Sequence, residues 1–578
     1  MRKREFAHMS LNSRPLIVQS DKTILLEVAS PAYEQARDAL IGFAELQKSP
    51  EHVHTYRITP LSLWNAAASG MSAQAILDAL SAYSKYPVPA IVAREIHDYV
   101  SRYGRVWLER REGALALCFL DDPTAIECSS HPRVKPFLLS RARDRAFFIS
   151  ETDRGHIKQA LTRIGYPVKD IAGYQEGTPF GFRLRPLTSS GKPFHLRAYQ
   201  AKAVEAFYAG GTAVGGSGIV VLPCGAGKTV IGMGVMSRIQ CETLILATNI
   251  VAVRQWIDEL IDKAEVVRSD IGEYTGEAKE VRSITVTTYQ ILTHRRAQDE
   301  GYPHFRLFSS KNWGLIIYDE VHLLPAPVFR ITAGLQATRR LGLTATLVRE
   351  DGQEEDVFSL IGPKKFDMPW RDLERQGWIA TAECHEIRVK MPDDARLEYA
   401  AAEPRQKFRI ASENRAKTRL VRFLLRRHAH DQVLIIGQYL DQLNDLASEL
   451  QAPLITGKTP NVERESLYGK FRAGDLKVLV VSKVANFAVD LPDASVAIQI
   501  SGTFGSRQEE AQRLGRVLRP KRNGRPASFY SLVTAETKDQ DFAAKRQLFL
   551  TEQGYYYRIW DASEFLTEDF AAGGGPSH

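Results

Sequence analysis

A glycine-rich loop near the middle of the chain carries the residue types that hold phosphate groups. Its sequence is Leu222-Pro223-Cys224-Gly225-Ala226-Gly227-Lys228-Thr229, and Leu222 stands where the longer GxxxxGKS/T pattern has its first glycine. Glycines let backbone N–H groups approach phosphate oxygens, Lys228 can reach the β- and γ-phosphates, and Thr229 can hold Mg²⁺. Residues 224–229 therefore predict a nucleotide site, with a chance GKT sequence in a surface loop as the alternative.

Two neighbouring carboxylates lie further along, in the sequence Asp319-Glu320-Val321-His322. They come directly after the apolar run 315–318, and the ligand groups of parallel sheets lie at the carboxyl ends of strands. Asp319 is predicted to hold Mg²⁺, and Glu320 to orient and deprotonate a water that attacks a phosphate. The tetrapeptide is common by chance, but its place after a strand and after the glycine loop favours this interpretation.

A third group of residues with possible chemistry is the sequence Gln512-Arg513-Leu514-Gly515-Arg516-Val517-Leu518-Arg519. Arg516 and Arg519 are three residues apart, so on a helix they project from one face. Guanidinium groups aimed at a nucleotide can stabilise charge on the transferring γ-phosphoryl group. These two residues are therefore predicted to be arginine fingers, and a basic helix on the surface is the alternative.

Strands that alternate with helices must position these residues. Strand-like apolar runs occur at 218–222, 243–247, 284–287, 315–318 and 340–344, and a second series occurs at 432–436, 478–481, 496–500 and 528–533. This alternation predicts two α/β halves, each a parallel sheet with helices on both faces. Because only the first half has a glycine loop of this kind, the second half is expected to supply groups to a nucleotide that the first half binds.

We place the two halves at 189–370 and 371–578. Two smaller units are predicted ahead of them. Residues 1–110 show three short helical patterns and then a strand at 104–108, which is typical of a winged-helix-like module that binds DNA or protein. Residues 111–188 predict a small α+β unit. Its basic residues are as consistent with phosphate contacts as with a solvated face; they are Arg133, Lys135, Arg141, Arg143 and Arg145.

The composition excludes several other classes of protein. The 578 residues carry a net charge of +8, with 44% hydrophobic and 25% charged residues, which is ordinary for a globular protein and compatible with an anionic partner. The five cysteines include no CxxC pair, which argues against a zinc site, an iron–sulfur cluster or a disulfide framework. No apolar run is long enough to span a bilayer, and no signal peptide follows the basic start. We expect a cytoplasmic monomer without a membrane partner.

Taken together, the motifs resemble those of superfamily 2 helicases and, within them, the XPB family. The resemblance covers residues 194–560. It rests on the glycine loop, the Asp-Glu-Val-His tetrapeptide and the runs 341–351, 505–519 and 545–555. It implies two tandem RecA-like domains. Residues 1–110 resemble an accessory N-terminal domain of the family, and residues 111–185 occupy the place of its damage-recognition domain.

The resemblance implies ATP-driven 3′→5′ movement on DNA in nucleotide excision repair, with Mg²⁺ as the metal ion. The implied nucleotide contacts are Arg197 and Gln200 at the adenine, the loop residues Cys224, Gly225, Ala226, Gly227, Lys228 and Thr229, and Asp490 near the ribose. The implied DNA contacts and coupling residues are Thr248, Gln255, Trp256, Thr287, Thr288, Tyr289, Gln290, Thr344 and Thr346. Arg349-Glu350-Asp351 match a family motif associated with strand separation, although the sequence alone also allows a simple polar loop.

Two other stretches of the second half bear on this interpretation. Ala485-Asn486 stand where the family usually has a Gly-Asp pair, which puts the efficiency of coupling in doubt, though not ATP binding. A short thumb-like insert is expected near 393–417. Its residues Arg405, Lys407 and Arg409 are predicted to contact DNA phosphates, and a solvated helix face is the alternative.

Two other functions are compatible with the same motifs. One is a double-strand translocase that remodels protein–DNA or transcription complexes without separating strands. The other is a motor that is inactive alone and works with a nuclease or another repair or transcription protein.

Overall fold

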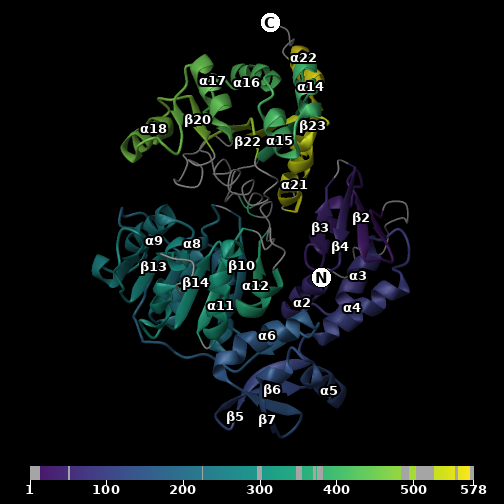
Figure 1. Cartoon of the computed structure of the whole chain (residues 1–578), viewed down its shortest axis with the longest axis vertical. Helices are drawn as coiled ribbons and strands as arrows, with labels where there is room; N and C mark the ends of the chain where they lie inside the picture. Colours follow the sequence, from purple (N-terminus) through teal and green to yellow (C-terminus); the bar gives the residue numbers. More distant parts are fainter. Residues whose placement is uncertain are drawn as a thin grey trace. The chain divides into compact units, whose positions relative to one another are not determined.

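The computed structural model of the chain (Figure 1) describes residues 14–49, 52–223, 225–295, 302–336, 338–345, 354–368, 373, 376, 382–482, 494–502, 526–552 and 557–572. These residues form two compact units, the first made largely of residues up to 368 and the second largely of residues from 369 onwards. Each unit contains a parallel sheet flanked by helices, which confirms the predicted fold class. Within the described ranges, no helix combines the length and apolar character that crossing a membrane requires.

The N-terminal region combines a small sheet with helices. Its elements are β1 (Leu16–Val18), β2 (Thr23–Glu27), α1 (Tyr33–Leu40), β3 (Glu45–Lys48), β4 (Val53–Arg57), α2 (Pro60–Ala68), α3 (Ala73–Tyr83) and α4 (Ala90–Arg102), and the strand order is β1-β2-β4-β3. Thr59 and Ser72 cap α2 and α3, and the side-chain oxygen of each accepts a backbone N–H from the first turn of its helix. The prediction of a mainly helical module missed the strands β3 and β4. These two strands are short and polar, so their sequences show no clear apolar run.

The small domain that follows has a five-stranded sheet in the described residues, with the order β7-β8-β6-β5-β9. Its elements are β5 (Val106–Arg111), β6 (Ala114–Phe119), α5 (Asp122–Ser130), β7 (Leu138–Ala142), β8 (Ala146–Ile149), α6 (Arg154–Arg163) and β9 (Val168–Asp170). Glu112 and Gly113, with φ of 52° and 80°, turn β5 back along β6. The strand predicted at 104–108 therefore pairs within the small domain, and the predicted boundary at residue 110 falls inside this hairpin.

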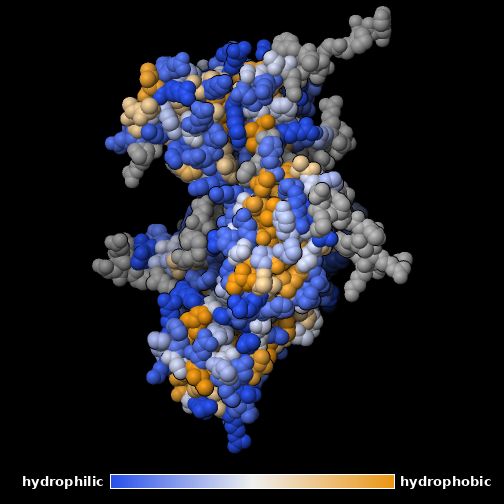
Figure 2. All heavy atoms as spheres, turned by 90° about the vertical axis from the view of Figure 1, so that its right-hand side faces the viewer, coloured by the Kyte–Doolittle hydropathy of each residue, from blue (hydrophilic) through white to orange (hydrophobic). Residues whose placement is uncertain are grey.

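The surface of the small domain is mixed in character. Arg133, Lys135, Arg141, Arg143 and Arg145 are all exposed. Large apolar side chains are exposed as well: Leu120, Ile126 and Leu139 are 55%, 66% and 68% exposed. Figure 2 shows hydrophilic and hydrophobic side chains interspersed on the lower part of its view. The domain thus offers both charged and apolar surface for contacts with other molecules.

The first parallel sheet has the order β12-β13-β11-β14-β15-β10-β16 in the described residues. Its strands are β10 (Ser217–Val221), β11 (Thr243–Ala247), β12 (Ile271–Tyr274), β13 (Ile284–Thr288), β14 (Leu315–Asp319), β15 (Arg339–Thr344) and β16 (Lys364–Asp367). The helices are α7 (Ala198–Tyr208), α8 (Lys228–Ile239), α9 (Ile250–Lys263), α10 (Tyr289–Thr293), α11 (Ala326–Gly334) and α12 (Glu354–Leu360). Every residue of β10, β11 and β13 is buried, as expected of strands covered on both faces.

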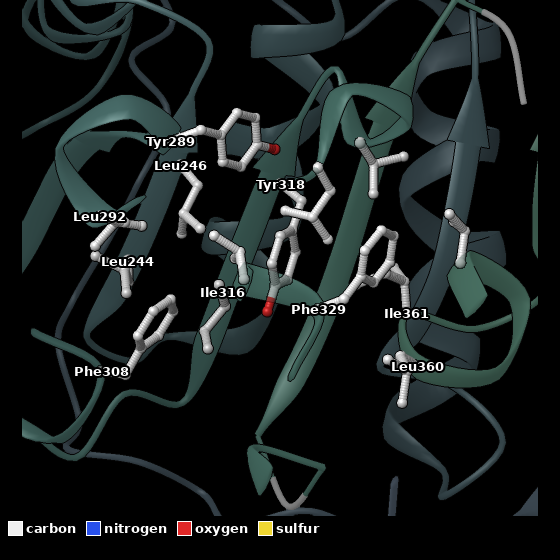
Figure 3. Packing of buried hydrophobic residues seen from close by; sticks show 14 of the residues in the cluster. Leu244, Leu246, Tyr289, Leu292, Phe308, Ile316, Tyr318, Phe329, Leu360 and Ile361 are labelled. Atoms are coloured by element: carbon white, nitrogen blue, oxygen red, sulfur yellow. The ribbon is translucent and has the colours of Figure 1, made fainter. Parts of the chain in front are cut away.

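One face of this sheet carries a large hydrophobic cluster (Figure 3). Leu244 and Leu246 of β11 point to this face, as do Ile316 and Tyr318 of the neighbouring strand β14. Along each strand they alternate with residues that point to the opposite face of the sheet. Phe329 of α11 packs over them. The apolar strand runs seen in the sequence thus form the core that fixes the carboxyl ends of the strands.

The segment just before residue 189, the predicted start of the first half, packs along the first sheet domain. Thr178 donates its N–H to the Asn312 carbonyl at 2.8 Å, and Arg185 donates to the Lys263 carbonyl at 2.9 Å. Gly177 approaches Gly314 so closely that a Cβ would lie 2.3 Å from the Gly314 Cα. The backbone up to residue 187 therefore packs on the surface of this domain. The sequence did not predict this packing, because the segment shows no apolar periodicity.

Helix α6 joins the small domain to the first sheet domain through buried charges. Asp170 accepts hydrogen bonds from Arg154 Nη2 at 2.7 Å and from Lys158 Nζ at 3.1 Å, and Lys158 also donates to Gln336 Oε1 at 2.6 Å. Burial would raise the pKa of Asp170, but the charges of Lys158 and Arg154 outweigh it and lower that pKa. Asp170 is thus the carboxylate that neutralises buried cations at this junction.

Asp170→Asn is expected to lower the free energy of unfolding by about 3–5 kcal/mol, because it leaves Arg154 and Lys158 buried without their counter-charge. Since the folded-state pKa of Asp170 lies below its unfolded value, the stabilisation is present above about pH 4 and is lost as the pH falls through the folded-state pKa. Denaturant unfolding at pH 7 and at acidic pH measures both effects. Glu151→Gln is the matched control, since its ion pair with Arg110 is exposed and is worth at most about 1 kcal/mol. Equal stabilities of the two variants would contradict the prediction.

The second unit repeats the parallel architecture, with the order β19-β20-β18-β21-β22-β17-β23 in the described residues. Its strands are β17 (Ala382–Val389), β18 (Val433–Gly437), β19 (Leu454–Ile455), β20 (Val478–Ser482), β21 (Val496–Gln499), β22 (Ala527–Thr534) and β23 (Tyr557–Asp561). The helices are α14 (Asp393–Ala401), α15 (Pro404–Ser412), α16 (Ala416–Arg427), α17 (Leu440–Leu450), α18 (Asn461–Ala473), α21 (Lys538–Glu552) and α22 (Ala562–Ala572). The predicted thumb-like insert corresponds to α14, α15 and the start of α16.

Candidate functional site

The glycine loop lies between the end of β10 and the start of α8, the strand–loop–helix arrangement that its sequence predicts. Gly225 and Gly227 adopt φ angles of 81° and 80°, in the left-handed region that residues with side chains rarely occupy. Gly227 directly precedes Lys228, the first residue of α8. The loop therefore leads into a helix N-terminus, whose N–H groups favour anions.

Gln200 packs against this loop. Its side chain is 4% exposed, and its Oε1 accepts the Arg197 N–H at 2.9 Å. A Cβ at Gly227 would lie 2.6 Å from Gln200 Nε2, so the amide touches the loop directly. Arg197 points its guanidinium toward the Tyr199 hydroxyl, at 3.3 Å. The structure thus places Gln200 against the loop expected at the phosphates, and Arg197 bonds Gln200 through its main-chain N–H.

Lys228 and Glu320 form an ion pair at the carboxyl end of the sheet. Lys228 Nζ lies 2.5 Å from Glu320 Oε1, and the two side chains are 11% and 14% exposed. Glu320 follows the last residue of β14 and has a φ of 49°, which is uncommon for a residue with a side chain. In a continued strand the side chains of Asp319 and Glu320 would point to opposite faces, and the turn at Glu320 ends that alternation.

The two carboxylates have different electrostatic environments. Burial, together with the charge of Glu320, raises the pKa of Asp319 to about 6, against the opposing effects of Lys228 and Trp256. Burial would also raise the pKa of Glu320, but the Lys228 ammonium and the nearby His322 outweigh it and lower that pKa. Glu320 is therefore ionised at neutral pH, the state in which it can accept a proton.

Asp319 is held by two aromatic residues from neighbouring helices. Trp256 of α9 donates its indole N–H to Asp319 Oδ2 at 2.9 Å, and Tyr289 of α10 donates its hydroxyl to the main-chain oxygen of Asp319 at 2.8 Å. The side chains of Trp256 and Tyr289 are 1% and 4% exposed. The resemblance places both residues along the path of DNA, and in this structure their side chains are buried and directed at Asp319.

His322 connects Glu320 with Thr344. His322 Nδ1 lies 2.6 Å from Thr344 Oγ1 and 3.5 Å from Glu320 Oε2. Thr344, expected to couple nucleotide and DNA, is fully buried at the end of β15. The sequence motifs assign no role to His322, and the signal that could have found it is its place in the same tetrapeptide as the two carboxylates.

The other residues expected along the DNA path divide by exposure. Gln255 and Gln290 are exposed and Thr248 is half-buried. Thr287 is buried and donates to the Tyr274 carbonyl, and Thr288 is buried and caps α10 by accepting the Ile291 N–H. Among these residues, the two glutamines therefore offer the most accessible polar groups for a ligand.

In the thumb-like insert, two of the residues predicted to contact DNA, Lys407 and Arg409, already have partners within the protein. Arg409 is exposed and paired with Glu413 at 3.0 Å and Asp441 at 2.9 Å, and Lys407 lies over the ring of Tyr399. The side chain of Arg405 is outside the described residues. Also outside them are Cys224, Thr346, Arg349, Glu350, Asp351, Ala485, Asn486, Asp490, Arg516 and Arg519.

Comparison with known proteins gives consistent matches along the chain. Three family models match: the ERCC3/RAD25/XPB C-terminal helicase over residues 373–570, the helicase conserved C-terminal domain over 16–143, and the type III restriction enzyme res subunit over 193–349. The chain is 53% identical to the DNA 3′-5′ helicase XPB of Mycobacterium tuberculosis, over 96% of this chain and 98% of that protein. It is 52% identical to the DNA 3′-5′ helicase XPB of Kineococcus radiotolerans, over 95% and 97%. It is 31% identical to the general transcription and DNA repair factor IIH helicase/translocase subunit XPB/SSL2 of Saccharomyces cerevisiae, over 96% of this chain and 74% of that one.

Proposed function

This chain belongs to the XPB family of DNA 3′–5′ helicases, and on that basis we propose that it couples ATP hydrolysis to 3′→5′ movement on DNA and opens duplex DNA in nucleotide excision repair. The observation that carries the proposal is the group of Lys228, Asp319 and Glu320 beside the glycine loop. A lysine for phosphate, a carboxylate for a metal ion and an ionised base are the parts that ATP hydrolysis requires. Eukaryotic relatives named as subunits of a transcription and DNA repair factor support the assignment to repair.

The residues beside the loop fit a complex of ATP with Mg²⁺. Burial and the neighbouring Glu320 charge raise the pKa of Asp319, so a cation next to this carboxylate would relieve an unfavourable charge. The Thr229 hydroxyl and the Asp319 carboxylate are oxygen ligands of the kind that Mg²⁺ prefers, with phosphates and water completing its shell. Bound there, Mg²⁺ would neutralise charge on the β- and γ-phosphates.

Glu320 is proposed as the general base. Its lowered pKa keeps it ionised, and the Lys228 ammonium, 2.5 Å away, can turn to the phosphates once ATP is bound. That exchange of partners leaves one Glu320 oxygen able to accept a proton from the attacking water. His322 Nδ1 lies 3.5 Å from the other carboxylate oxygen and bonds the Thr344 hydroxyl, and this chain of residues is proposed to link Glu320 to the state of the DNA.

DNA is proposed to run past α9 and α10. Gln255 and Gln290 are exposed on these helices; α9 begins shortly after β11, and α10 begins directly after β13, the strand paired with β11. Arg349-Glu350-Asp351 are proposed to act at strand separation, and Thr346 and Asp490 to couple the two halves. The exposed Arg409, with Arg405 and Lys407, is proposed to exchange its intramolecular partners for DNA phosphates.

The basic face of the small domain is proposed to select the DNA structure on which the motor acts. Replacing its exposed cations with alanine is expected to weaken binding to forked duplex and to flatten its salt dependence, by about 0.9 in the log–log slope for each phosphate that is no longer neutralised. The replaced residues are Arg133, Lys135, Arg141, Arg143 and Arg145. Binding is measured by fluorescence anisotropy between low and high salt, alongside ATPase with single-stranded DNA, which should be retained.

The matched control removes Lys202 and Arg238, which are exposed on α7 and α8 of the first sheet domain. An unchanged salt slope in the small-domain variant would overturn the DNA role of this face. The exposed Leu120, Ile126 and Leu139 then favour the alternative, in which the small domain binds a protein partner.

The proposed function is tested by measuring ATPase and strand separation together. We expect ATPase stimulated by DNA and unwinding of a forked duplex by the chain alone. Stimulation by duplex DNA without unwinding would favour a translocase that remodels protein–DNA or transcription complexes. Unwinding that appears only after a nuclease or repair protein is added would favour a motor that depends on its partner. Absence of any DNA-stimulated ATPase would overturn the proposal.

A further inference from the structure

We infer that Trp256 and Tyr289 are positioning residues that transmit DNA binding at α9 and α10 to Asp319, and so make ATP hydrolysis depend on DNA. The inference rests on the proposed function as a DNA-dependent ATPase. It assigns these two residues a different role from the direct DNA contact that the family resemblance implies. Both side chains end on one residue, Asp319.

The strand order brings the three segments together. β11 lies between β13 and β14, and all three run parallel, so their carboxyl ends meet at one edge of the sheet. Helix α9 begins just after β11, α10 begins directly after β13, and Asp319 ends β14. Both helices therefore reach Asp319 with an aromatic side chain.

Trp256 is buried and packs closely against a neighbouring helix. A Cβ at Gly232 of α8 would lie 2.6 Å from the Trp256 Cη2 atom, so the indole packs directly on that helix. Helix α8 starts with Lys228. The indole thus touches the helix that carries the phosphate-binding lysine and donates to the carboxylate proposed to hold the metal ion. A shift of α9 would alter both contacts.

Tyr289 acts on the main chain at the same place. Its hydroxyl bonds the carbonyl oxygen of Asp319, which belongs to the peptide unit joining Asp319 to Glu320. Figure 3 shows this hydroxyl directed toward the strand that carries Tyr318, while the Tyr318 hydroxyl points away from Tyr289. Because Glu320 adopts a left-handed φ of 49°, the orientation of this peptide sets the direction of the proposed base.

Each buried aromatic residue has an exposed glutamine as its neighbour in sequence. Gln255 precedes Trp256 on α9, and Gln290 follows Tyr289 on α10. Consecutive residues of a helix point about 100° apart, so one side chain can face a ligand outside while the next faces the interior. DNA bound by the glutamines would therefore bias the position of the two helices, and the aromatic hydrogen bonds carry that bias to Asp319.

The test uses variants that remove one hydrogen-bond donor and keep an aromatic ring. In Trp256→Phe and Tyr289→Phe, we expect kcat for ATP in the presence of saturating DNA to fall about tenfold, since a hydrogen bond that orients Asp319 is removed. The DNA dissociation constant should stay within about twofold of the unmodified chain, because neither side chain is exposed. The Mg²⁺ concentration for half-maximal hydrolysis should rise in Trp256→Phe, as its donor bonds the carboxylate itself.

Matched controls exist in the same domain. Trp313→Phe removes a buried indole N–H that bonds the Leu307 carbonyl, and Tyr318→Phe removes a buried hydroxyl that bonds Thr332. Both should keep DNA-stimulated kcat and the Mg²⁺ requirement. Gln255→Ala should differ from its neighbour Trp256→Phe by weakening DNA binding, because its exposed amide is the group proposed to contact DNA.

The outcomes separate this inference from the proposed function. If the unmodified chain shows no DNA-stimulated ATPase, the proposed function fails. If it is stimulated but both aromatic variants keep full stimulation and the normal Mg²⁺ requirement, the inference alone fails. If Trp256→Phe or Tyr289→Phe weakens DNA binding and leaves kcat unchanged, the aromatic residues contact DNA and the inference is overturned. Thermal unfolding confirms that each variant is folded, and the near-isosteric Tyr289→Phe decides the matter should Trp256→Phe not fold.

Discussion

Glu320→Gln is expected to leave ATP bound and to slow its hydrolysis by at least about two orders of magnitude, the contribution expected of a general base. The amide keeps the shape of the side chain but cannot take a proton from water. It also breaks the ion pair with Lys228, which can then hold phosphate. Single-turnover hydrolysis with Mg²⁺–ATP, together with binding of a fluorescent ATP analogue, separates the chemical step from affinity.

Two further variants show whether the effect belongs to this position. Glu242 is another buried glutamate paired with a lysine of the same domain, Lys311, so Glu242→Gln should keep near-normal ATPase. Lys228→Ala should weaken ATP binding as well as turnover, unlike Glu320→Gln. Near-normal hydrolysis in Glu320→Gln would remove this residue from the role of base.

Arg516→Ala and Arg519→Ala are each expected to lower turnover by about three orders of magnitude with much less change in ATP affinity, because an arginine finger acts mainly on charge that develops in the transition state. Both residues lie outside the described part of the structure, so this prediction rests on their sequence motif. Steady-state ATPase with saturating DNA gives the turnover, and nucleotide titration gives the affinity.

An exposed arginine of the second unit serves as the control for these fingers. Arg426 of α16 is exposed, so Arg426→Ala should retain turnover. Circular dichroism establishes that all three variants are folded. Unchanged turnover in both Arg516→Ala and Arg519→Ala would return that segment to the alternative of a basic surface helix.

Features that depend on local chemistry could be predicted from the amino-acid sequence alone. The glycine loop could be recognised because positive φ angles and close phosphate approach demand glycine, and the structure has such angles at Gly225 and Gly227. Parallel strands could be placed because strands covered on both faces need continuous apolar runs, as in β11 and β14. The order of the strands, however, depends on how helices cross over between them, and it follows from no single segment.

Which side chains meet depends on the tertiary structure. Trp256 and Asp319 are 63 residues apart in sequence, and Lys158 and Gln336 are 178 residues apart. Their contacts depend on strand order, register and helix packing, which local residue patterns do not encode. Which side chains are exposed also depends on the tertiary structure. Gln255 and Trp256 are adjacent in sequence, and the family resemblance gives both the same expected role. The packing of α9 on the sheet sends one outward to a ligand and the other inward to a carboxylate, because neighbouring residues of a helix point in different directions.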